Sequence, residues 1–381
     1  MKITIERNGR TAVLRLPAEE AEMSKAEKSC RVYDPTDTVF RLVNMDSAYP
    51  ELKRLEGQDC DLDHLNLLAR VCGGLCERED RQFQAGIVLN DVRDLTGMIN
   101  TVMNCQRYSL AVPGESLSNV GRNRYFDLYG GYPVGSITDE EFERMGEELL
   151  AQEGTDTPYG RVFVNDMPEN PFFDGKHLPA YYDRPDLIFA VFLKHGDDSE
   201  FLTLPCADTA VSKALKRLGV KDSQDCEVEF DTLQVDLGET ADLLCENPHT
   251  DIFDINRLAA ALNPLDDDEL DRFLAAVRFM EQRSTASTAA DLADIAQNLS
   301  DFVYVPGADD EYSYGQYLIR ESGRYGYDEN LDDYYDYGSL GADTALQERG
   351  IFTEDGYIGI CGDSVLPEQM DSTEQEMGGM V

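Results

Sequence analysis

Residues 14–26, LRLPAEEAEMSKA, recur farther along the chain as residues 202–214, LTLPCADTAVSKA. Six of the thirteen aligned positions are identical, and the two stretches align without a gap at an offset of 188 residues. In both copies an apolar run leads into Leu-Pro, and a short helix pattern follows. The recurrence indicates that the chain contains two related units, which directs the search toward further repeats.

Three more pairs of segments match in the same order along the chain. The pairs are 64–87 with 254–277, 112–114 with 305–307, and 145–153 with 340–348. Their offsets rise only from 190 to 195 residues, as short loop insertions would cause. A single match could arise by chance, but several in one order predict a tandem duplication.

The matches place the first unit at residues 1–162 and the second at residues 163–365. The remaining residues, 366–381, are polar and are predicted to be a disordered tail. Within each unit, strand-like runs alternate with helical patterns, which is typical of an α+β protein. We expect each unit to hold a small antiparallel sheet with a helix, a helical middle part and an α/β C-terminal part.

Some segment boundaries can be predicted directly. Residues 187–193 form a strand-like run, and the helix pattern that begins near Asp208 should end at Gly219. Thr138 and Glu141 have the spacing of a capping box at the start of a helix. Residues 305–307, Val-Pro-Gly, predict a turn before the next helix.

The charge is strongly acidic. The 381 residues include 75 acidic and 33 basic side chains, so the formal net charge is −42. Such a balance argues against direct binding to nucleic acid or to anionic membranes, which requires clustered lysine and arginine. The 16 phenylalanines and 19 tyrosines nevertheless predict a packed core rather than a disordered acidic chain. Residues 151–381 carry 49 acidic and 15 basic residues, so most of the excess lies in the second unit.

Targeting segments are not apparent. The chain has no run of about 18 apolar residues, so we expect no membrane-spanning helix. Its first residues, MKITIERN, do not resemble a signal peptide. The nine cysteines are odd in number and scattered through apolar segments, which predicts free buried thiols and a cytoplasmic protein.

Catalytic and metal-binding motifs are also missing. The sequence has no GxGxxG, GxxxxGK[ST], GxSxG or HExxH pattern, and none of its four histidines has metal-ligand spacing. Cys72 and Cys76 lie one turn apart if one helix carries both, which favours a helix face over zinc. The acids at 266–269 and 309–311 precede helices, where carboxylates are favoured without any ion. We therefore expect no enzyme activity, no cofactor and no metal.

The second unit carries motifs of a known family. Residues 291–299, DLADIAQNL, are followed by VPG at 305–307 and by YGQYL at 314–318. The run YDYGSLGAD at 335–343 then precedes GIFTEDGYI at 350–358. In order and spacing these segments resemble the ArdA-type antirestriction proteins, closely over residues 250–360 and more weakly over residues 1–160.

The run at 335–343 resembles the antirestriction motif of that family. The matching positions are Asp336, Tyr337, Leu340, Gly341 and Asp343. Two positions depart from the family pattern, because Gly338 replaces a glutamate and Ala342 replaces a basic residue. The first unit keeps only the hydrophobic, glycine and acidic skeleton of the motif.

The resemblance implies an elongated protein whose carboxylates imitate the phosphates of duplex DNA. Such a protein is non-catalytic, occupies the DNA-binding cleft of type I restriction–modification enzymes and is encoded on mobile genetic elements. Self-association through the motif is also implied. The alternative is an acidic interaction protein that inhibits another DNA-binding target or acts as a chaperone for basic proteins.

The charge is physically compatible with DNA mimicry. Duplex DNA carries one charge per about 1.7 Å, so a net charge of −42 corresponds to roughly 70 Å of duplex if all of it is displayed. We expect the partner to bind mainly the second unit, since it carries most of the acid. The predicted acidic binding residues are Asp266, Asp267, Asp268, Glu269, Asp309, Asp310, Glu311, Asp332 and Asp333.

Overall fold

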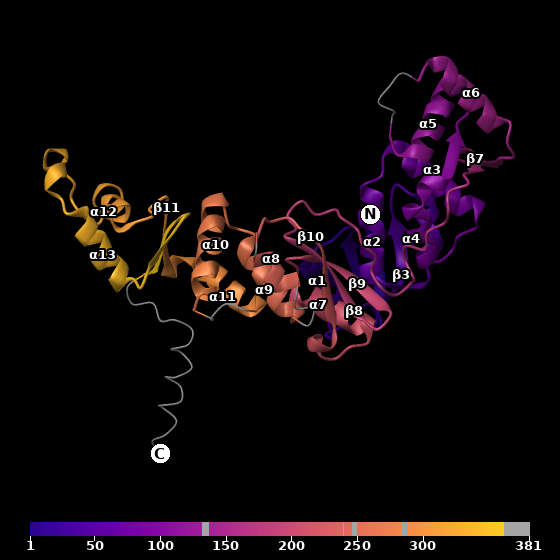
Figure 1. Cartoon of the computed structure of the whole chain (residues 1–381). Coiled ribbons are helices and arrows are strands. Elements are labelled where there is room, and N and C mark those ends of the chain that lie inside the picture. Colours follow the sequence, from indigo (N-terminus) through magenta and orange to yellow (C-terminus); the bar gives the residue numbers. More distant parts are fainter. Residues whose placement is uncertain (132–136, 239, 246–249, 284–287, 362–381) are drawn as a thin grey trace. The chain divides into compact units, whose positions relative to one another are not determined.

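The structure, a computed structural model, describes residues 1–131, 137–238, 240–245, 250–283 and 288–361 (Figure 1). The predicted tail, residues 366–381, lies outside the described residues. The predicted α+β class is confirmed, since helices alternate with small antiparallel sheets. None of the described helices combines the length and the apolar character needed to span a membrane.

The chain divides into two compact units, and neither is continuous in sequence. From here on, the first unit and the second unit mean these compact units. The first consists of Met1–Pro185, Gly196–Phe201 and Ala207–Lys221. The second consists of Asp186–His195, Leu202–Cys206 and Asp222–Val381. These units follow spatial contacts, whereas the predicted boundary at residue 162 follows the sequence repeat, so the repeat boundary stays a prediction.

The first unit begins with a four-stranded sheet in the order β2-β1-β3-β4. Its strands are β1 (Lys2–Arg7), β2 (Arg10–Arg15), β3 (Val39–Asp46) and β4 (Asp59–Asp61). Side chains alternate across a strand, so Ile3 and Ile5 of β1 enter the core while Lys2 stays exposed. Helix α1 (Glu20–Ser29) contacts β2, and the short 3₁₀ helix η1 (Pro50–Leu55) precedes β4.

Helices and a second sheet complete the first unit. The sheet has the order β5-β7-β6. The elements are α2 (Leu62–Gly73), α3 (Glu77–Leu89), α4 (Leu95–Met103), η2 (Cys105–Arg107), β5 (Tyr108–Ala111), α5 (Leu117–Tyr129), α6 (Asp139–Leu150), β6 (Thr155–Thr157), β7 (Gly160–Val164) and α7 (Asp208–Leu218). Leu68, Phe83 and Ile99 are fully buried, so α2, α3 and α4 share one apolar core with the first sheet.

The second unit contains two three-stranded sheets, in the orders β10-β8-β9 and β11-β13-β12. Only residues 202–204 of β9 belong to this unit. The strands are β8 (Phe189–His195), β9 (Asp198–Leu204), β10 (Glu227–Leu233), β11 (Phe302–Pro306), β12 (Ile351–Thr353) and β13 (Gly356–Ile360). The helices are η3 (Ser223–Asp225), α8 (Thr240–Cys245), α9 (Ile252–Leu262), α10 (Asp267–Glu281), α11 (Ala289–Gln297), η4 (Leu299–Asp301), α12 (Glu311–Arg320), η5 (Glu329–Tyr334) and α13 (Tyr337–Gln347).

The order of elements in the first half of the chain recurs in the second. The strands β2-β1-β3 correspond to β9-β8-β10, and β5-β7-β6 corresponds to β11-β13-β12. Between these sheets, α2 to α4 correspond to α9 to α11, and α5 and α6 correspond to α12 and α13. The same side-chain contact also occurs twice at aligned positions, as the next paragraph describes.

An asparagine clamps the residue after Leu-Pro in each half. Asn66 of α2 accepts a hydrogen bond from the backbone N–H of Ala18 at 2.8 Å and donates one to its carbonyl at 2.9 Å. Asn256 of α9 makes the same two bonds with Cys206, both at 2.8 Å. The paired bonds satisfy both backbone groups of a residue that lies outside any helix or strand.

Glycines allow a close crossing of two helices in each half. A Cβ atom on Gly121 of α5 would lie 1.8 Å from the carbonyl oxygen of Phe142 in α6, and one on Gly315 of α12 would lie 1.9 Å from that of Tyr337 in α13. Gly341 of α13 faces the carbonyl oxygen of Glu311 in the same way. No side chain fits at these contacts, so glycine at these positions sets the helix separation.

Several boundaries predicted from the sequence are confirmed. Helix α7 ends at Gly219, which adopts the left-handed conformation, and Thr138 forms a capping box with Glu141. Three predictions are wrong. Cys72 and Cys76 do not share a helix, because α2 ends at Gly73 and Cys76 caps α3.

The second wrong prediction concerns residues 305–307. Val305 and Pro306 end strand β11, and only Gly307, with a φ of 74°, turns the chain. Proline is tolerated there because it is the last residue of the strand and β11 lies at the sheet edge. Cys76 and Cys245 also differ from the predicted buried thiols, since both are exposed.

A buried ion network joins α7 to the remainder of the first unit. The Lys213 side chain is 2% exposed, and its Nζ lies 2.7 Å from Glu20, 3.1 Å from Asp63 and 3.6 Å from Glu27. Burial opposes its charge, but these carboxylates raise the pKa of Lys213 to about 12. Buried charges are tolerated only when they are paired, so this lysine holds three acids in place.

Arg217 extends the network by one helical turn. Its guanidinium lies 2.7 Å from Asp63 and 2.7 Å from Glu200, whose side chain is fully buried. The two cations therefore share Asp63 between them. Every member of the network belongs to the first compact unit, so charge pairs attach α7 to that unit.

We predict that Lys213→Met destabilises the first unit by about 3–5 kcal/mol, because it leaves buried carboxylates without their cation. Urea unfolding of the full chain, followed by circular dichroism, measures this change. Lys25→Met is the matched control, since Lys25 aligns with Lys213 but is exposed and should change stability by less than about 0.5 kcal/mol. Equal effects of the two substitutions would contradict the prediction.

A second prediction concerns pH. Burial raises the pKa of Glu200 to about 7, although Arg217 opposes the shift. The ordinary pKa of a glutamic acid side chain is 4.5. Between pH 4.5 and about 7, the carboxyl of Glu200 is therefore ionised in the unfolded chain but still protonated in the folded chain. The free energy of unfolding consequently falls as the pH rises through this window. The unfolding free energy of Glu200→Gln, relative to wild type, should therefore increase across this window in urea titrations.

The exposed Glu143 provides the control for this experiment. Glu143→Gln makes the same isosteric substitution at the surface and is measured at the same pH values. A constant difference from wild type for Glu200→Gln would show that burial of this carboxyl does not perturb its titration.

Candidate functional site

The first predicted acidic cluster lies at the start of α10. Asp266 caps the helix, and its Oδ1 accepts a hydrogen bond from the backbone N–H of Glu269 at 2.9 Å. The Glu269 side chain accepts a hydrogen bond from the backbone N–H of Asp266, which completes a capping box. Asp267 and Asp268 occupy the first turn, and all four side chains are exposed. The helix dipole favours anions here, so the cluster is both fixed and accessible.

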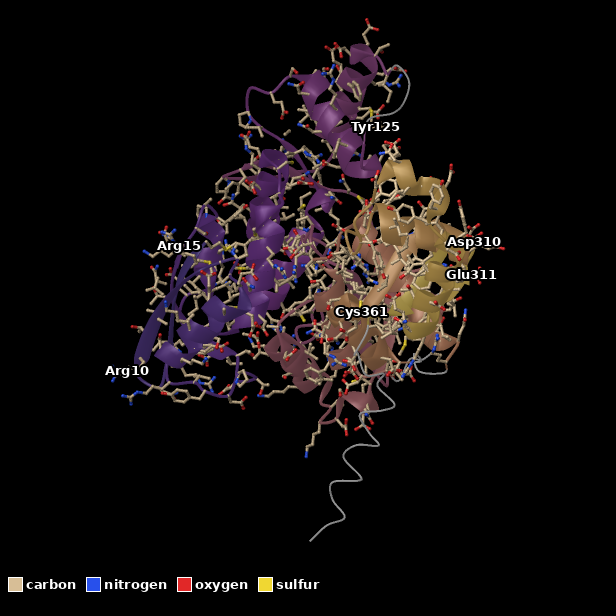
Figure 2. The ribbon with its side chains drawn as sticks, turned by 90° about the vertical axis from the view of Figure 1, so that its left-hand side faces the viewer. Arg10, Arg15, Tyr125, Asp310, Glu311 and Cys361 are labelled. Atoms are coloured by element: carbon tan, nitrogen blue, oxygen red, sulfur yellow. The ribbon has the colours of Figure 1, made fainter. Side chains whose placement is uncertain are left out.

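The second cluster lies at the start of α12. Asp310 caps this helix through the backbone N–H of Ser313 at 2.7 Å. This hydrogen bond lowers the pKa of Asp310, so the carboxylate stays ionised. Asp309 and Glu311 flank it and are exposed. Figure 2 shows Asp310 and Glu311 directed outward from α12.

Asp332 and Asp333 have different environments, although they are adjacent. Both oxygens of Asp332 accept hydrogen bonds from Arg320 at 2.7 Å, and one also accepts from the Tyr337 hydroxyl at 2.7 Å. Those hydrogen bonds, first from Tyr337 and then from Arg320, lower the pKa of Asp332. Asp332 is therefore engaged within the chain, whereas Asp333 is exposed.

The residues of the predicted antirestriction motif lie on α13. Asp336 caps the helix and accepts hydrogen bonds from the backbone N–H and the hydroxyl of Ser339, which lower its pKa. Tyr337 and Gly341 are buried against α12, and Leu340 packs partly against the neighbouring apolar cluster. Asp343 is exposed. The motif thus combines buried residues that hold α13 on α12 with acids at the surface.

A buried glutamate connects the end of α13 to α12 and β13. The side chain of Glu348 is buried and accepts hydrogen bonds from the hydroxyls of Tyr314 at 2.6 Å and Tyr357 at 2.9 Å. Its other oxygen accepts from Arg324 at 2.9 Å. The Tyr314 and Tyr357 rings stack with centroids 3.8 Å apart. These contacts link α12, the end of α13 and β13. The helices that carry the exposed acids are therefore held in a fixed arrangement.

Sequence reasoning missed a group of exposed tyrosines in α12 and in the segment that follows it. Tyr334 is 84% exposed, and Tyr325 and Tyr312 are about half exposed. Their signal in the sequence was the density of tyrosine over residues 325–337, which the search for charges passed over. Aromatic side chains at this exposure are typical of protein-binding surfaces.

Two observations on the described residues concern metal binding and cavities. Among the described residues, no group of three or more histidines, cysteines and acids could hold a metal ion. A cavity of about 360 Å³ lies in the first unit, and its walls include Arg78, Gln82 and Glu115. Arg78 and Gln82 donate to the buried carboxylate of Asp127, so they have a structural role. None of the predicted binding residues lines this cavity.

Comparison with known proteins agrees with the motifs. Residues 197–359 match the model of a family described as antirestriction protein (ArdA). No curated protein matches the chain. The match spans both acidic clusters, α13 and the exposed tyrosines, and the resemblance seen in the sequence is confirmed over this segment. Residues 197–359 are therefore similar to the ArdA family, and we call them the ArdA-type segment.

Proposed function

We propose that this chain is a non-catalytic antirestriction protein that occupies the DNA-binding cleft of type I restriction–modification enzymes. The observation that carries the proposal is the set of exposed carboxylates at the starts of α10, α12 and α13, all within the ArdA-type segment. A cleft that binds DNA gains affinity by neutralising fixed phosphates. Fixed carboxylates can pair with the same cationic side chains of the cleft, although they present no nucleobase.

The way these carboxylates are held supports mimicry of a rigid polyanion. Asp266, Asp310 and Asp336 each accept a hydrogen bond from a backbone N–H of the helix they cap. The side chains therefore lose little additional freedom when a partner binds, which favours affinity. A flexible acidic tail would have to be ordered first, at an entropic cost.

We further propose that the chain arose by tandem duplication of one such unit. The shared order of elements, the two asparagine clamps and the two glycine crossings support this. The copies have diverged in charge, since residues 1–150 have a net charge of −8 and the remainder of −34. The second copy would then be the main inhibitor and the first a related scaffold.

Inhibition should be stoichiometric, competitive with DNA and weakened by salt. Exposed charges are screened over about 8 Å at physiological ionic strength, so raising salt from 50 to 200 mM should weaken inhibition strongly. Titrating the full chain against a purified type I enzyme, with DNA concentration varied, measures all three properties. Complete inhibition at far below one protein per enzyme would indicate catalysis and contradict the proposal.

A basic protein unrelated to DNA cleavage serves as the control partner. An acidic chaperone would bind it as tightly as it binds the restriction enzyme at equal salt. The proposal predicts weaker binding to that control, since it requires that the arrangement of the carboxylates suits a DNA cleft.

The binding acids should act together. Asp267→Asn alone should weaken inhibition by less than about fivefold, because a single exposed charge contributes roughly 1 kcal/mol or less. Neutralising six acids with isosteric amides should weaken it by far more. The six are Asp266, Asp267, Asp268, Asp309, Asp310 and Glu311. Asparagine retains the capping function at 266 and 310, so the fold should persist.

A matched variant separates position from net charge. It neutralises six exposed glutamates of the first unit, namely Glu77, Glu140, Glu143, Glu147, Glu148 and Glu153. Both variants change the net charge equally. A restriction assay in cells should show a clear loss only for the first variant, whereas equal losses would mean that net charge alone determines inhibition.

A further inference from the structure

The segment between α12 and α13 holds aromatic side chains at the surface of the second unit. Four rings contact one another in succession, and we call them the tyrosine ladder: Tyr312 of α12, the buried Tyr337 of α13, and Tyr335 and Tyr327 from the segment between these helices. Their consecutive centroids lie 5.5, 5.8 and 6.0 Å apart. Tyr325 and Tyr334 are close in sequence to Tyr327 and Tyr335 of the ladder and are among the most exposed aromatic residues of the described chain.

A polar node keeps this segment in place. Arg320 pairs with both oxygens of Asp332, and Asp332 also accepts from the hydroxyls of Tyr327 and Tyr337. The Tyr335 hydroxyl in turn accepts from the backbone N–H of Asp328 at 3.1 Å. The exposed rings are therefore supported by an ordered loop, so their exposure is a property of the fold.

The node also shows which ligand these rings can accept. The guanidinium of Arg320 lies 5.7 Å from the ring centre of Tyr327 and 5.3 Å from that of Tyr337 while it pairs with Asp332. A planar cation is thus held by aromatic rings and a carboxylate together. Outside the node, Tyr334 and Tyr325 present the same kind of ring to solvent, and the exposed Asp333 directly precedes Tyr334.

Those neighbouring acids determine the charge of any partner. Asp328, Glu329, Asp333 and Asp336 are exposed and lie within the segment or at its end. Pairing with the same surface of a second copy would bring like charges together, which is costly. Charge complementarity therefore favours a cationic protein surface over a second copy of this chain.

We propose that the segment from Glu321 to Asp336, with the tyrosine ladder, is a docking surface for arginine side chains of the partner. Arginine suits it better than lysine, because a planar guanidinium stacks on a ring and pairs with a carboxylate at once. The surface would supply specificity beyond the charge attraction of the acidic clusters. The inference rests on the proposed function, since it takes the partner to be a DNA-binding protein.

The test uses the full chain and two simple probes, nona-arginine and nona-lysine peptides. Their charges are equal, so electrostatic attraction alone would bind them alike. Wild-type protein should bind nona-arginine more tightly. Tyr325→Ala with Tyr334→Ala should reduce that preference by about 2–5-fold for each ring, as expected for exposed cation–π contacts. Fluorescence anisotropy of labelled peptides measures both affinities.

Two controls separate ring chemistry from folding. Tyr334→Phe keeps the ring and should retain the preference. Tyr33→Ala removes another tyrosine, 75% exposed and next to Asp34, and should also leave the preference unchanged. A wild-type protein that binds both peptides equally, or a double variant that keeps the preference, would overturn the inference.

A type I restriction assay on the same proteins keeps the two proposals distinguishable. Failure of wild-type protein to inhibit the enzyme refutes the proposed function, whatever the peptides show. Inhibition by wild type that is undiminished in the double variant refutes the docking surface and leaves the proposed function standing. Weaker inhibition by the double variant, with Tyr33→Ala unaffected, supports the docking surface.

Discussion

Repulsion among like charges is the constraint on which this structure depends. A net charge of −42 on one chain disfavours the compact state, so the fold must place its acids where something offsets them. Helix N-termini are one such place, and they hold Asp266, Asp310 and Asp336. Buried cations are another, as Lys213 shows in the first unit. Acids in these positions can remain charged without separating the elements that carry them.

The two units use these devices differently. In the first, acids such as Asp63 are buried around Lys213 and Arg217 and contribute to holding α7 in place. In the ArdA-type segment, the acids at the starts of α10 and α12 are exposed and are held only by their own helices. The same residue type is therefore structural in one unit and available to a partner in the other.

Binding in the ArdA-type segment combines two kinds of contact in our proposal. The acidic clusters supply long-range attraction, which any basic protein would feel and which salt weakens. The aromatic segment between α12 and α13 supplies short-range contacts, which depend on the shape of the cation. Close packing of α13 on α12 through Gly315 and Gly341 keeps both kinds of contact on one framework.

The sequence by itself determined the α+β class, the capping box at Thr138, the acids before the helix near residue 266 and the resemblance of residues 197–359 to the ArdA family, because these depend on local patterns. Only the tertiary structure decided which charged groups are free. Lys25 and Lys213 align in the repeat, yet one is exposed and the other buried among carboxylates. In the sequence, Asp332 cannot be distinguished from its acidic neighbours, yet in the structure its carboxylate forms a salt bridge with Arg320. Partners distant in sequence set these environments, and no local pattern encodes them.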